Sequence, residues 1–341
     1  MSKVLRRLAS TKVVVFPGQG RFDLRSLSKL AEHKENPVVK TILREADETL
    51  PTLQLSKFIT DPQAALRTNT TQSTSVQQPL LILTSFLAYN LLKSEKNINL
   101  LDGTQFLLGH SLGEISAMVV QDAVPFSAGL ELAHTRGLLM EKTVAKTGNS
   151  YSTQALLFEP THYKYIDNLL AQVDIQIGNY NNYQQIVVSG VRSQLLDKID
   201  QMRMKLVKAG IWKTRIRNLD LRVSIPFHNP LLREIEPDLE EIFERSCICS
   251  DLKVPVLSNL NGEIVKDANE QAKNIVQVTS RPVQFVKCLE KLSELDTDLE
   301  FVSFGAIPLK IIDQFFHDLK RLKSINIAHS GRTVDQLFND P

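Results

Sequence analysis

The chain has 341 residues, of which 43% are hydrophobic and 23% charged, so it can bury one large core with an insertion, or form two domains. The net charge is only +2, which gives no reason to expect a nucleic-acid partner. Three cysteines, two of them in one Cys-x-Cys pair, fit neither a disulfide framework nor a zinc site, and no apolar run is long enough to span a bilayer. We therefore expect no metal and no membrane partner.

The first eleven residues, MSKVLRRLAST, include Lys3, Arg6 and Arg7 and no acidic residue. This composition is typical of a mitochondrial presequence, which is Arg-rich and acid-poor, and it fits a basic N-terminus without a targeting role equally well. Residues 1–11 are therefore a possible targeting segment.

Short apolar runs alternate with helical patterns in the first 150 residues. Residues 13–16 and 105–108 predict buried strands, each followed by a glycine-containing turn. Helices are expected over 26–32, 37–50, 76–92, 115–120 and 126–142. Strands that alternate with helices predict a parallel sheet covered on both faces.

The middle of the chain has a different order of elements. Strands are expected over 155–158, 175–179, 185–189 and 212–216, with helices over 163–173 and 192–208 and a polar Asn/Tyr loop between the second and third strands. This β-α-β-β-α-β order is the ferredoxin-like signature, and it predicts an inserted subdomain over 152–220. The α/β pattern resumes with helices at 231–246 and 309–322, strands at 254–258 and 299–304, and a helical stretch at 272–292 broken at Arg281-Pro282. The large subdomain would then comprise 12–151 and 221–341.

Residues 109–113, Gly-His-Ser-Leu-Gly, match the G-x-S-x-G nucleophile elbow. The sharp turn from strand to helix requires glycines beside Ser111, and it would expose this serine at a helix N-terminus, where backbone N–H groups can stabilise an oxyanion. A glycine-rich turn without a catalytic role is the alternative. His110, beside the serine, is expected to be structural.

A nucleophilic serine requires a base, and His228 is one candidate because Pro226 and Pro230 restrict the loop that carries it. Pro17-Gly18-Gln19-Gly20 follows the first predicted strand and could supply backbone donors. Taken alone, this second segment is better interpreted as a plain tight turn.

Taken together, PGQG at 17–20, GHSLGE at 109–114, Arg136-Gly137 and IPFHNP at 225–230 occur in an order that resembles the malonyl-CoA:acyl carrier protein transacylases and the acyltransferase domains of fatty acid and polyketide synthases. Segments at 179–181, 255–262 and 280–285 resemble further parts of that family. The resemblance implies an α/β fold with a hydrolase-like, parallel-sheet large subdomain and an inserted ferredoxin-like small subdomain, with the active site between them.

By motif match, the resemblance implies that Ser111 is the nucleophile and His228 its base. The backbone N–H groups of Gln19 and Leu112 would form the oxyanion hole, and Arg136 would bind the malonyl carboxylate. A structural salt bridge from Arg136 to Glu131 or Glu141 is the alternative.

Two further roles are implied by the resemblance. Phe227, with Leu112, would favour malonyl over bulkier methylmalonyl groups, although Phe227 could simply pack in the core. The backbone carbonyl of Val278, at a position where the family often has glutamine, would orient His228.

The expected activity is malonyl transfer from malonyl-CoA to the phosphopantetheine thiol of acyl carrier protein, through a malonyl-serine, in fatty acid synthesis and without a cofactor. An α/β-hydrolase esterase or thioesterase is the alternative, since it shares the elbow, but it gives Arg136 and the PGQG loop no role. We expect a monomer in the mitochondrial matrix, with a cytoplasmic location as the alternative.

Overall fold

Six strands form the larger of two sheets in the computed structural model, which describes residues 10–20, 24–67, 73–211, 216–246, 251–295 and 297–339. Their order is β10-β9-β1-β2-β7-β8, and the neighbours pair in parallel except at the β7–β8 edge. The strands are β1 (Thr11–Phe16), β2 (Thr104–Gly109), β7 (Asp251–Leu257), β8 (Ile264–Asp267), β9 (Leu299–Ser303) and β10 (His329–Thr333). The carboxyl ends of β1, β2 and β7 therefore lie at one edge, where the loops with chemical motifs begin.

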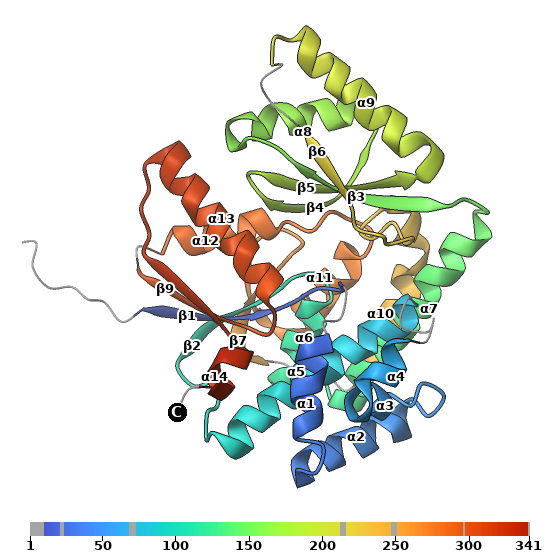
Figure 1. Ribbon diagram of the computed structural model, residues 1–341, viewed down its shortest axis with the longest axis vertical. Helices are drawn as coiled ribbons and strands as arrows, with labels where there is room; N and C mark the ends of the chain where they lie inside the picture. Colours follow the sequence, from blue (N-terminus) through green and yellow to red (C-terminus); the bar gives the residue numbers. More distant parts are fainter. Residues whose placement is uncertain are drawn as a thin grey trace, which may run out of the picture.

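Helices cover both faces of this sheet (Figure 1). They are α1 (Leu24–Glu32), α2 (Pro37–Thr49), α3 (Ser56–Thr60), α4 (Pro62–Leu66), α5 (Thr74–Glu95), α6 (Gly113–Val120), α7 (Phe126–Lys146), α10 (Glu236–Arg245), α11 (Ala268–Val278), α12 (Phe285–Ser293), α13 (Ala306–Lys323) and α14 (Val334–Asn339). Along β1, Val14 and Phe16 enter one core while Val13 and Val15 enter the other, because successive strand side chains point to opposite faces. None of the described helices is long and apolar enough to cross a bilayer.

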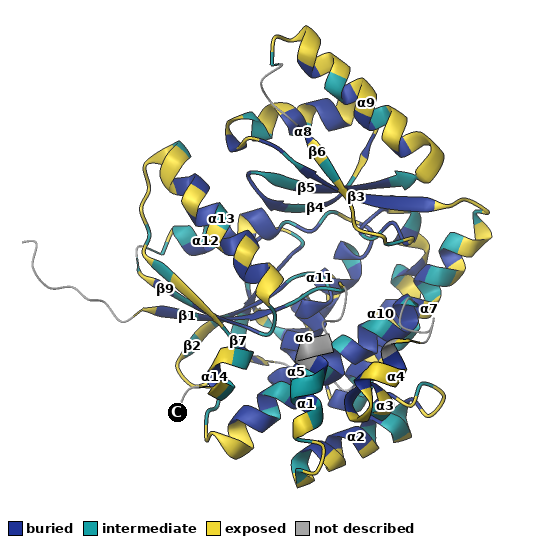
Figure 2. Cartoon of the chain, viewed as in Figure 1, coloured by how far each residue is buried: buried dark blue, intermediate teal, exposed yellow. Residues whose placement is uncertain are grey.

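The smaller sheet has the order β4-β5-β3-β6, and all of its pairs are antiparallel. Its elements are β3 (Tyr151–Leu157), α8 (Tyr163–Gln172), β4 (Gln176–Asn182), β5 (Gln185–Val191), α9 (Arg192–Lys208) and β6 (Arg217–Asp220). Both helices pack on the side away from the large subdomain, and α9 exposes its outer side (Figures 1 and 2). The predicted fold class, a mostly parallel large sheet with a ferredoxin-like insertion, is confirmed.

Several predicted boundaries were wrong. The Asn/Tyr segment is not a long loop: β4 extends to Asn182, and the amide of this residue donates to the Ile311 carbonyl at 3.1 Å. The helix expected over 231–246 divides into a 3-10 turn, Pro230–Ile235, and α10, whose first turn accommodates Pro237. Of the strand expected at 212–216, residues 212–215 lie outside the described residues, and β6 begins at Arg217.

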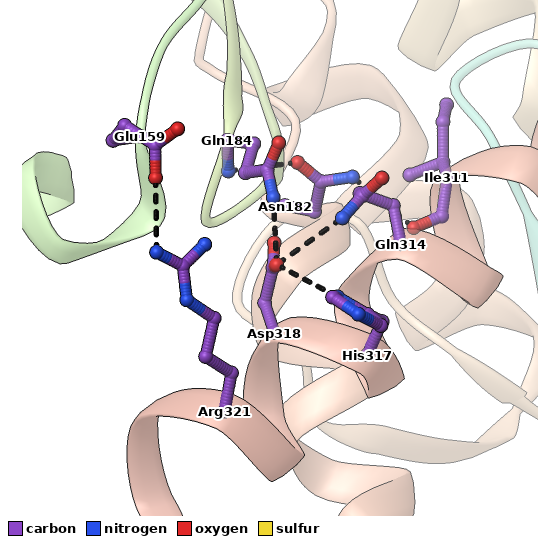
Figure 3. Close-up of polar contacts among 8 residues, drawn as sticks. All are labelled: Glu159, Asn182, Gln184, Ile311, Gln314, His317, Asp318 and Arg321. Carbon is purple, nitrogen blue, oxygen red and sulfur yellow. Dashed lines mark hydrogen bonds and ion pairs between the residues drawn. The ribbon is translucent and has the colours of Figure 1, made fainter. Parts of the chain in front are cut away.

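Polar contacts join the two subdomains at α13 (Figure 3). Asp318 of this helix is fully buried and accepts hydrogen bonds from Gln184 at 2.7 Å and from Gln314 at 3.1 Å. On the surface nearby, Arg321 forms an ion pair with Glu159 at 3.2 Å. Because Gln184 and Glu159 belong to the inserted segment, this cluster connects the small sheet to the large subdomain.

Candidate active site

The Gly-His-Ser-Leu-Gly segment turns the chain from β2 into α6. Ser111 has a φ of +53°, in the left-handed region that L-residues rarely adopt. A Cβ on Gly109 would lie 2.1 Å from the backbone nitrogen of Glu114, and one on Gly113 would lie 2.4 Å from the Phe16 carbonyl oxygen. Both flanking glycines are therefore required by close packing, for the steric reason inferred from the sequence.

Ser111 and His228 lie in direct contact, although 117 positions separate them. The Ser111 Oγ is 2.6 Å from the His228 Nε2, and the His228 Nδ1 is 2.6 Å from the carbonyl oxygen of Val278. A carbonyl can only accept, so Nδ1 carries the proton and Nε2 presents its lone pair to the serine hydroxyl. Burial, aided by the positive charge of Arg136, lowers the pKa of His228 to about 3. The imidazole is therefore neutral at pH 7 and able to accept a proton.

The loop that carries His228 is fastened by the small sheet. Thr153 of β3 donates to the Ile225 carbonyl at 3.3 Å, and Asn229 donates to the Ser189 hydroxyl of β5 at 3.3 Å. His228 itself has a φ of +58°, a second left-handed residue in the site. The two residues of the Ser–His pair are thus positioned by different sheets.

The PGQG loop lies against the serine turn. A Cβ on Gly18 would lie 2.7 Å from the His110 carbonyl oxygen, so the glycine permits this approach. Among the described residues, neither the N–H of Gln19 nor that of Leu112 donates to a backbone or side-chain acceptor. Leu112 also occupies the N-cap position of α6, where the helix dipole is positive. The structure thus leaves both predicted oxyanion donors available.

Arg136, on α7, is only 3% exposed. Its Nη1 donates to the Gln78 side chain of α5 at 3.0 Å, and its Nε lies 3.4 Å from the Thr279 hydroxyl. In the described part of the chain it forms no ion pair, and Glu141, one of the alternative partners, instead accepts from Ser73 and from the Ser75 N–H. The guanidinium thus has neutral hydrogen-bond partners only.

Burial lowers the pKa of Arg136 to about 10, partly offset by the negative charge of Glu114. The side chain is still a cation at neutral pH. Burial likewise raises the pKa of Glu114 to about 7, against hydrogen bonds from Asn259 and Gln271 and the charge of Arg136. Arg136 is thus a cation almost without solvent contact, and the acid beside it, Glu114, is only partly ionised at pH 7. Binding of an anionic ligand next to Arg136 would therefore be favourable.

A chain of amides joins this cation to the PGQG loop. Gln78 accepts from Arg136 and lies 3.3 Å from the Gln19 side chain, which donates in turn to Gln77 at 2.9 Å. Sequence reasoning missed Gln78, Thr279, Glu114 and Asn259 as members of the site. Glu114 and Asn259 stand in segments that the resemblance had marked, but their partners depend on the folded structure.

Two other predicted residues have different surroundings. Phe227 is half-buried and packs against the larger hydrophobic core, as its alternative interpretation expects. His110 does not contact the serine hydroxyl: its Nε2 lies 2.9 Å from the Asn181 side chain of β4, and its ring packs against Phe285. The structural role expected for His110 agrees with these contacts.

Comparison with known proteins identifies the class. The model of the acyl transferase domain family matches residues 13–330. This chain therefore belongs to the acyl transferase family and is an acyltransferase.

Within the acyl transferase family, similar proteins have more specific names. Proteins named malonyl CoA-acyl carrier protein transacylase are 30% identical over 315 residues in Staphylococcus aureus (92% of this chain, 93% of the relative) and 28% identical over 317 residues in Bacillus subtilis (92% of each). A solved transacylase of that name from Clostridium perfringens is 21% identical, with a TM-score of 0.76 over 97% of this chain and 96% of the other. The last similarity supports the fold.

Proposed function

We propose that this protein transfers the malonyl group of malonyl-CoA to the phosphopantetheine thiol of acyl carrier protein, through a malonyl ester on Ser111. The observation that carries the proposal is the buried Arg136, a cation with neutral partners beside a Ser–His pair. The malonyl group of malonyl-CoA has a free carboxylate at one end and a thioester at the other. The carboxylate can pair with Arg136 while the thioester carbonyl faces Ser111 and His228. The names of the bacterial relatives agree with this substrate pair.

The reaction has two half-steps. In the first, Ser111 Oγ attacks the thioester carbonyl while His228 Nε2 takes its proton, and the N–H groups of Gln19 and Leu112 stabilise the oxyanion. Collapse breaks the carbon–sulfur bond, and His228 returns the proton to the leaving CoA sulfur. In the second, the carrier thiol gives its proton to His228 and attacks the malonyl ester, which releases Ser111 with its proton restored.

The hydrolase alternative is not favoured. In a Ser-His-Asp triad a carboxylate orients the histidine, whereas here the Nδ1–H of His228 donates to the backbone carbonyl of Val278. An esterase for neutral acyl groups would also leave the buried Arg136 without an anion. We propose in addition that Phe227, beside His228, disfavours substituents on the malonyl α-carbon.

The proposed location rests on the composition of the first eleven residues. The basic, acid-free first eleven residues support our proposal of a mitochondrial matrix enzyme, and we propose that it acts as a monomer. Imaging of the full chain fused to a C-terminal fluorescent protein, with and without residues 1–11, tests the first point. Light scattering in solution tests the second.

Intact-mass analysis after mixing with malonyl-CoA tests the proposed reaction. We expect a covalent malonyl adduct that maps to Ser111 and disappears when holo acyl carrier protein is added, with malonyl appearing on the carrier. An adduct on another residue, or release of free malonate with no loading of the carrier, would contradict the proposal.

A further inference from the structure

Asn259 lies two residues beyond β7, beside the serine turn, and has no part in the reaction described above. Its side chain is fully buried. The parallel pairing of β2 with β7 ends at the pair Leu108 and Leu257, where β7 ends, and β2 ends one residue later at Gly109, where the turn begins. Continuing the same register would place Asn259 opposite His110.

The carboxamide of Asn259 bonds to the main chain on both sides of His110. Its Oδ1 accepts from the Ser111 N–H at 2.7 Å, and its Nδ2 donates to the Gly109 carbonyl at 2.7 Å. A side-chain amide has the donor and acceptor of a peptide group, so it takes over the hydrogen bonding where the strand ladder stops. Buried main-chain groups in the turn are thereby satisfied.

This arrangement has two consequences for Ser111. Asn259 holds the left-handed backbone of Ser111 through two hydrogen bonds, one from the Ser111 N–H and one to the Gly109 carbonyl. In addition, the Ser111 N–H is occupied by Asn259, so the Leu112 N–H is the amide that the turn can direct at an oxyanion. The position of the nucleophile and the choice of donor therefore both depend on one side chain.

Asn259 is itself fixed by the helix that follows the turn. Glu114, in the first turn of α6, accepts through one carboxylate oxygen from the Asn259 N–H at 2.9 Å and from the Gln271 side chain at 2.8 Å. On its other side, the carbonyl of Asn259 accepts from the Gln284 N–H at 2.7 Å. The chain from Gly109 to Glu114 and Asn259 are therefore joined into a closed loop by three hydrogen bonds, at Gly109, Ser111 and Glu114.

We propose that Asn259 is a positioning residue for the nucleophile: it clamps the serine turn in the geometry of attack, with Glu114 as the anchor of the clamp. The inference rests on the proposed function, because it assumes that Ser111 is the residue acylated. Misplacing a nucleophile by about 1 Å costs on the order of 100-fold in rate. The loss should fall on the chemical step, since none of the hydrogen bonds that Asn259 forms with the described residues involves Arg136, which is proposed to bind the malonyl carboxylate.

The test compares Asn259→Ala with a matched control, Asn261→Ala. Asn261 is two residues further along the same loop, is exposed, and within the described part of the chain accepts a local bond from the Glu263 N–H and no other. We expect Asn259→Ala to lower the rate of Ser111 acylation at saturating malonyl-CoA about 100-fold, with KM within about threefold of the wild type. The control should change neither value by more than about twofold. A rate within about threefold of the wild type, or a loss confined to KM, would overturn the proposal.

Two measurements separate this test from the proposed function. Labelling by a fluorophosphonate reports the reactivity of Ser111 without any malonyl substrate, and hydrogen exchange reports protection of the Ser111 amide. Both should decline in Asn259→Ala even if malonyl proves to be the wrong acyl group. Unchanged labelling and unchanged protection would overturn the clamp, whereas failure of the wild type to take malonyl would overturn only the proposed function.

Conservative variants keep the test decisive if Asn259→Ala does not fold. Asn259→Asp retains the acceptor for the Ser111 N–H but places an oxygen against the Gly109 carbonyl, and it should be slowed at least about tenfold. At the anchor, Glu114→Gln keeps an acceptor for the Asn259 N–H and should be slowed less than Glu114→Ala, which loses the acceptor and should be slowed about tenfold or more. Equal rates for the two Glu114 variants would contradict the assigned role of Glu114 as anchor.

Discussion

Arg136 and Asp318 are both almost fully withdrawn from solvent, but the molecule compensates their charges differently. Asp318 accepts from two carboxamides of its own chain, one on each subdomain, and lies 3.6 Å from the exposed ring of His317, while burial raises the pKa of its carboxyl (Figure 3). Burial thus favours the neutral form of this carboxyl, whereas its hydrogen bonds favour the charged form. Arg136 keeps its positive charge near pH 7, because the pKa of its guanidinium is still about 10.

The surroundings of these two buried charges distinguish a residue that holds the fold together from one that binds a ligand. A guanidinium has five N–H donors, and Arg136 uses two of its three nitrogens on neutral acceptors. Asp318 is held by donors that the fold itself supplies, and so serves to join the subdomains. A buried cation whose hydrogen-bond partners are all neutral, and whose neighbouring acid Glu114 is only partly ionised at pH 7, indicates a place for an anionic ligand. The variants below test that distinction, beginning with the largest expected effect.

Replacing Ser111 with alanine should reduce malonyl transfer by at least about 10⁴-fold, because the reaction loses its covalent step. Intact mass should show no malonyl adduct. The control is Ser116→Ala, which removes a buried hydroxyl from α6 on the same chain segment. Transfer that survives in Ser111→Ala would place the chemistry elsewhere and remove the basis of the comparison.

Replacing His228 with alanine should slow acylation by about 10²- to 10⁴-fold, the usual contribution of a general base. His317→Ala, whose side chain is 70% exposed, is the control and should be unaffected. A folded His228→Ala variant with a nearly normal rate would show that another group accepts the proton.

The lowered pKa of His228 also predicts how the free energy of unfolding depends on pH. Its pKa is about 3 when folded and 6.5 when unfolded, so between these values the unfolded chain binds a proton that the folded chain does not. Stability is therefore lost as the pH falls from about 6.5 towards 3, by about 2 kcal/mol at pH 5. Denaturant unfolding at pH 7 and pH 5 should show a smaller loss in His228→Ala than in the wild type. Equal losses in the two proteins would contradict a buried neutral histidine.

Replacing Arg136 with alanine should remove a charge-assisted contact of about 2–4 kcal/mol, and so lower malonyl transfer by roughly 30- to 1000-fold. Acetyl-CoA has no carboxylate, so acetyl loading should be unchanged or improved. Arg136→Lys, which retains the charge but not the planar pair of donors, should fall between the two. The measurement is the ratio of malonyl to acetyl loading, and a constant ratio would make Arg136 part of the scaffold.

Replacing Asp318 with asparagine should have the smallest effect, since the shape of the side chain is kept and Asp318 lies in the contacts between the subdomains, not beside Ser111 or Arg136. We expect the transfer rate within about twofold of the wild type and a change in unfolding free energy of at most about 1 kcal/mol. Kinetics and denaturant unfolding of the same preparation check both values. A selective loss of malonyl transfer here would show that the Asp318 cluster belongs to the site after all.

Local sequence was sufficient for the longer elements and for the elbow. The glycines on each side of Ser111 are dictated by a tight turn, and the continuous apolar run at 13–16 predicted the buried strand β1. The short elements at the edge of the large sheet were missed: β8, β10 and α14 have 4 to 6 residues each, too few to show a period.

The electrostatic surroundings of the site could not be predicted in the same way. Asn259 reaches Ser111 across 148 positions, and Thr279 reaches Arg136 across 143. No local pattern encodes such pairs, because they depend on which loops the sheet order brings to one edge. Motif resemblance supplied Ser111, His228 and Arg136, whereas only the folded structure shows that Arg136 has neutral partners.

The separation of Ser111 from His228 has a consequence for biosynthesis. During translation the serine emerges 117 residues before the histidine, which at about 5–20 residues per second is a delay of roughly 6–23 s. The histidine loop is fastened to Thr153 and Ser189, so the small sheet must also be complete before the pair can form. A ribosome-bound chain that ends before His228 lacks both the base and Asn259, so its Ser111 hydroxyl is neither positioned nor activated, and malonyl-CoA cannot be consumed by unfinished molecules.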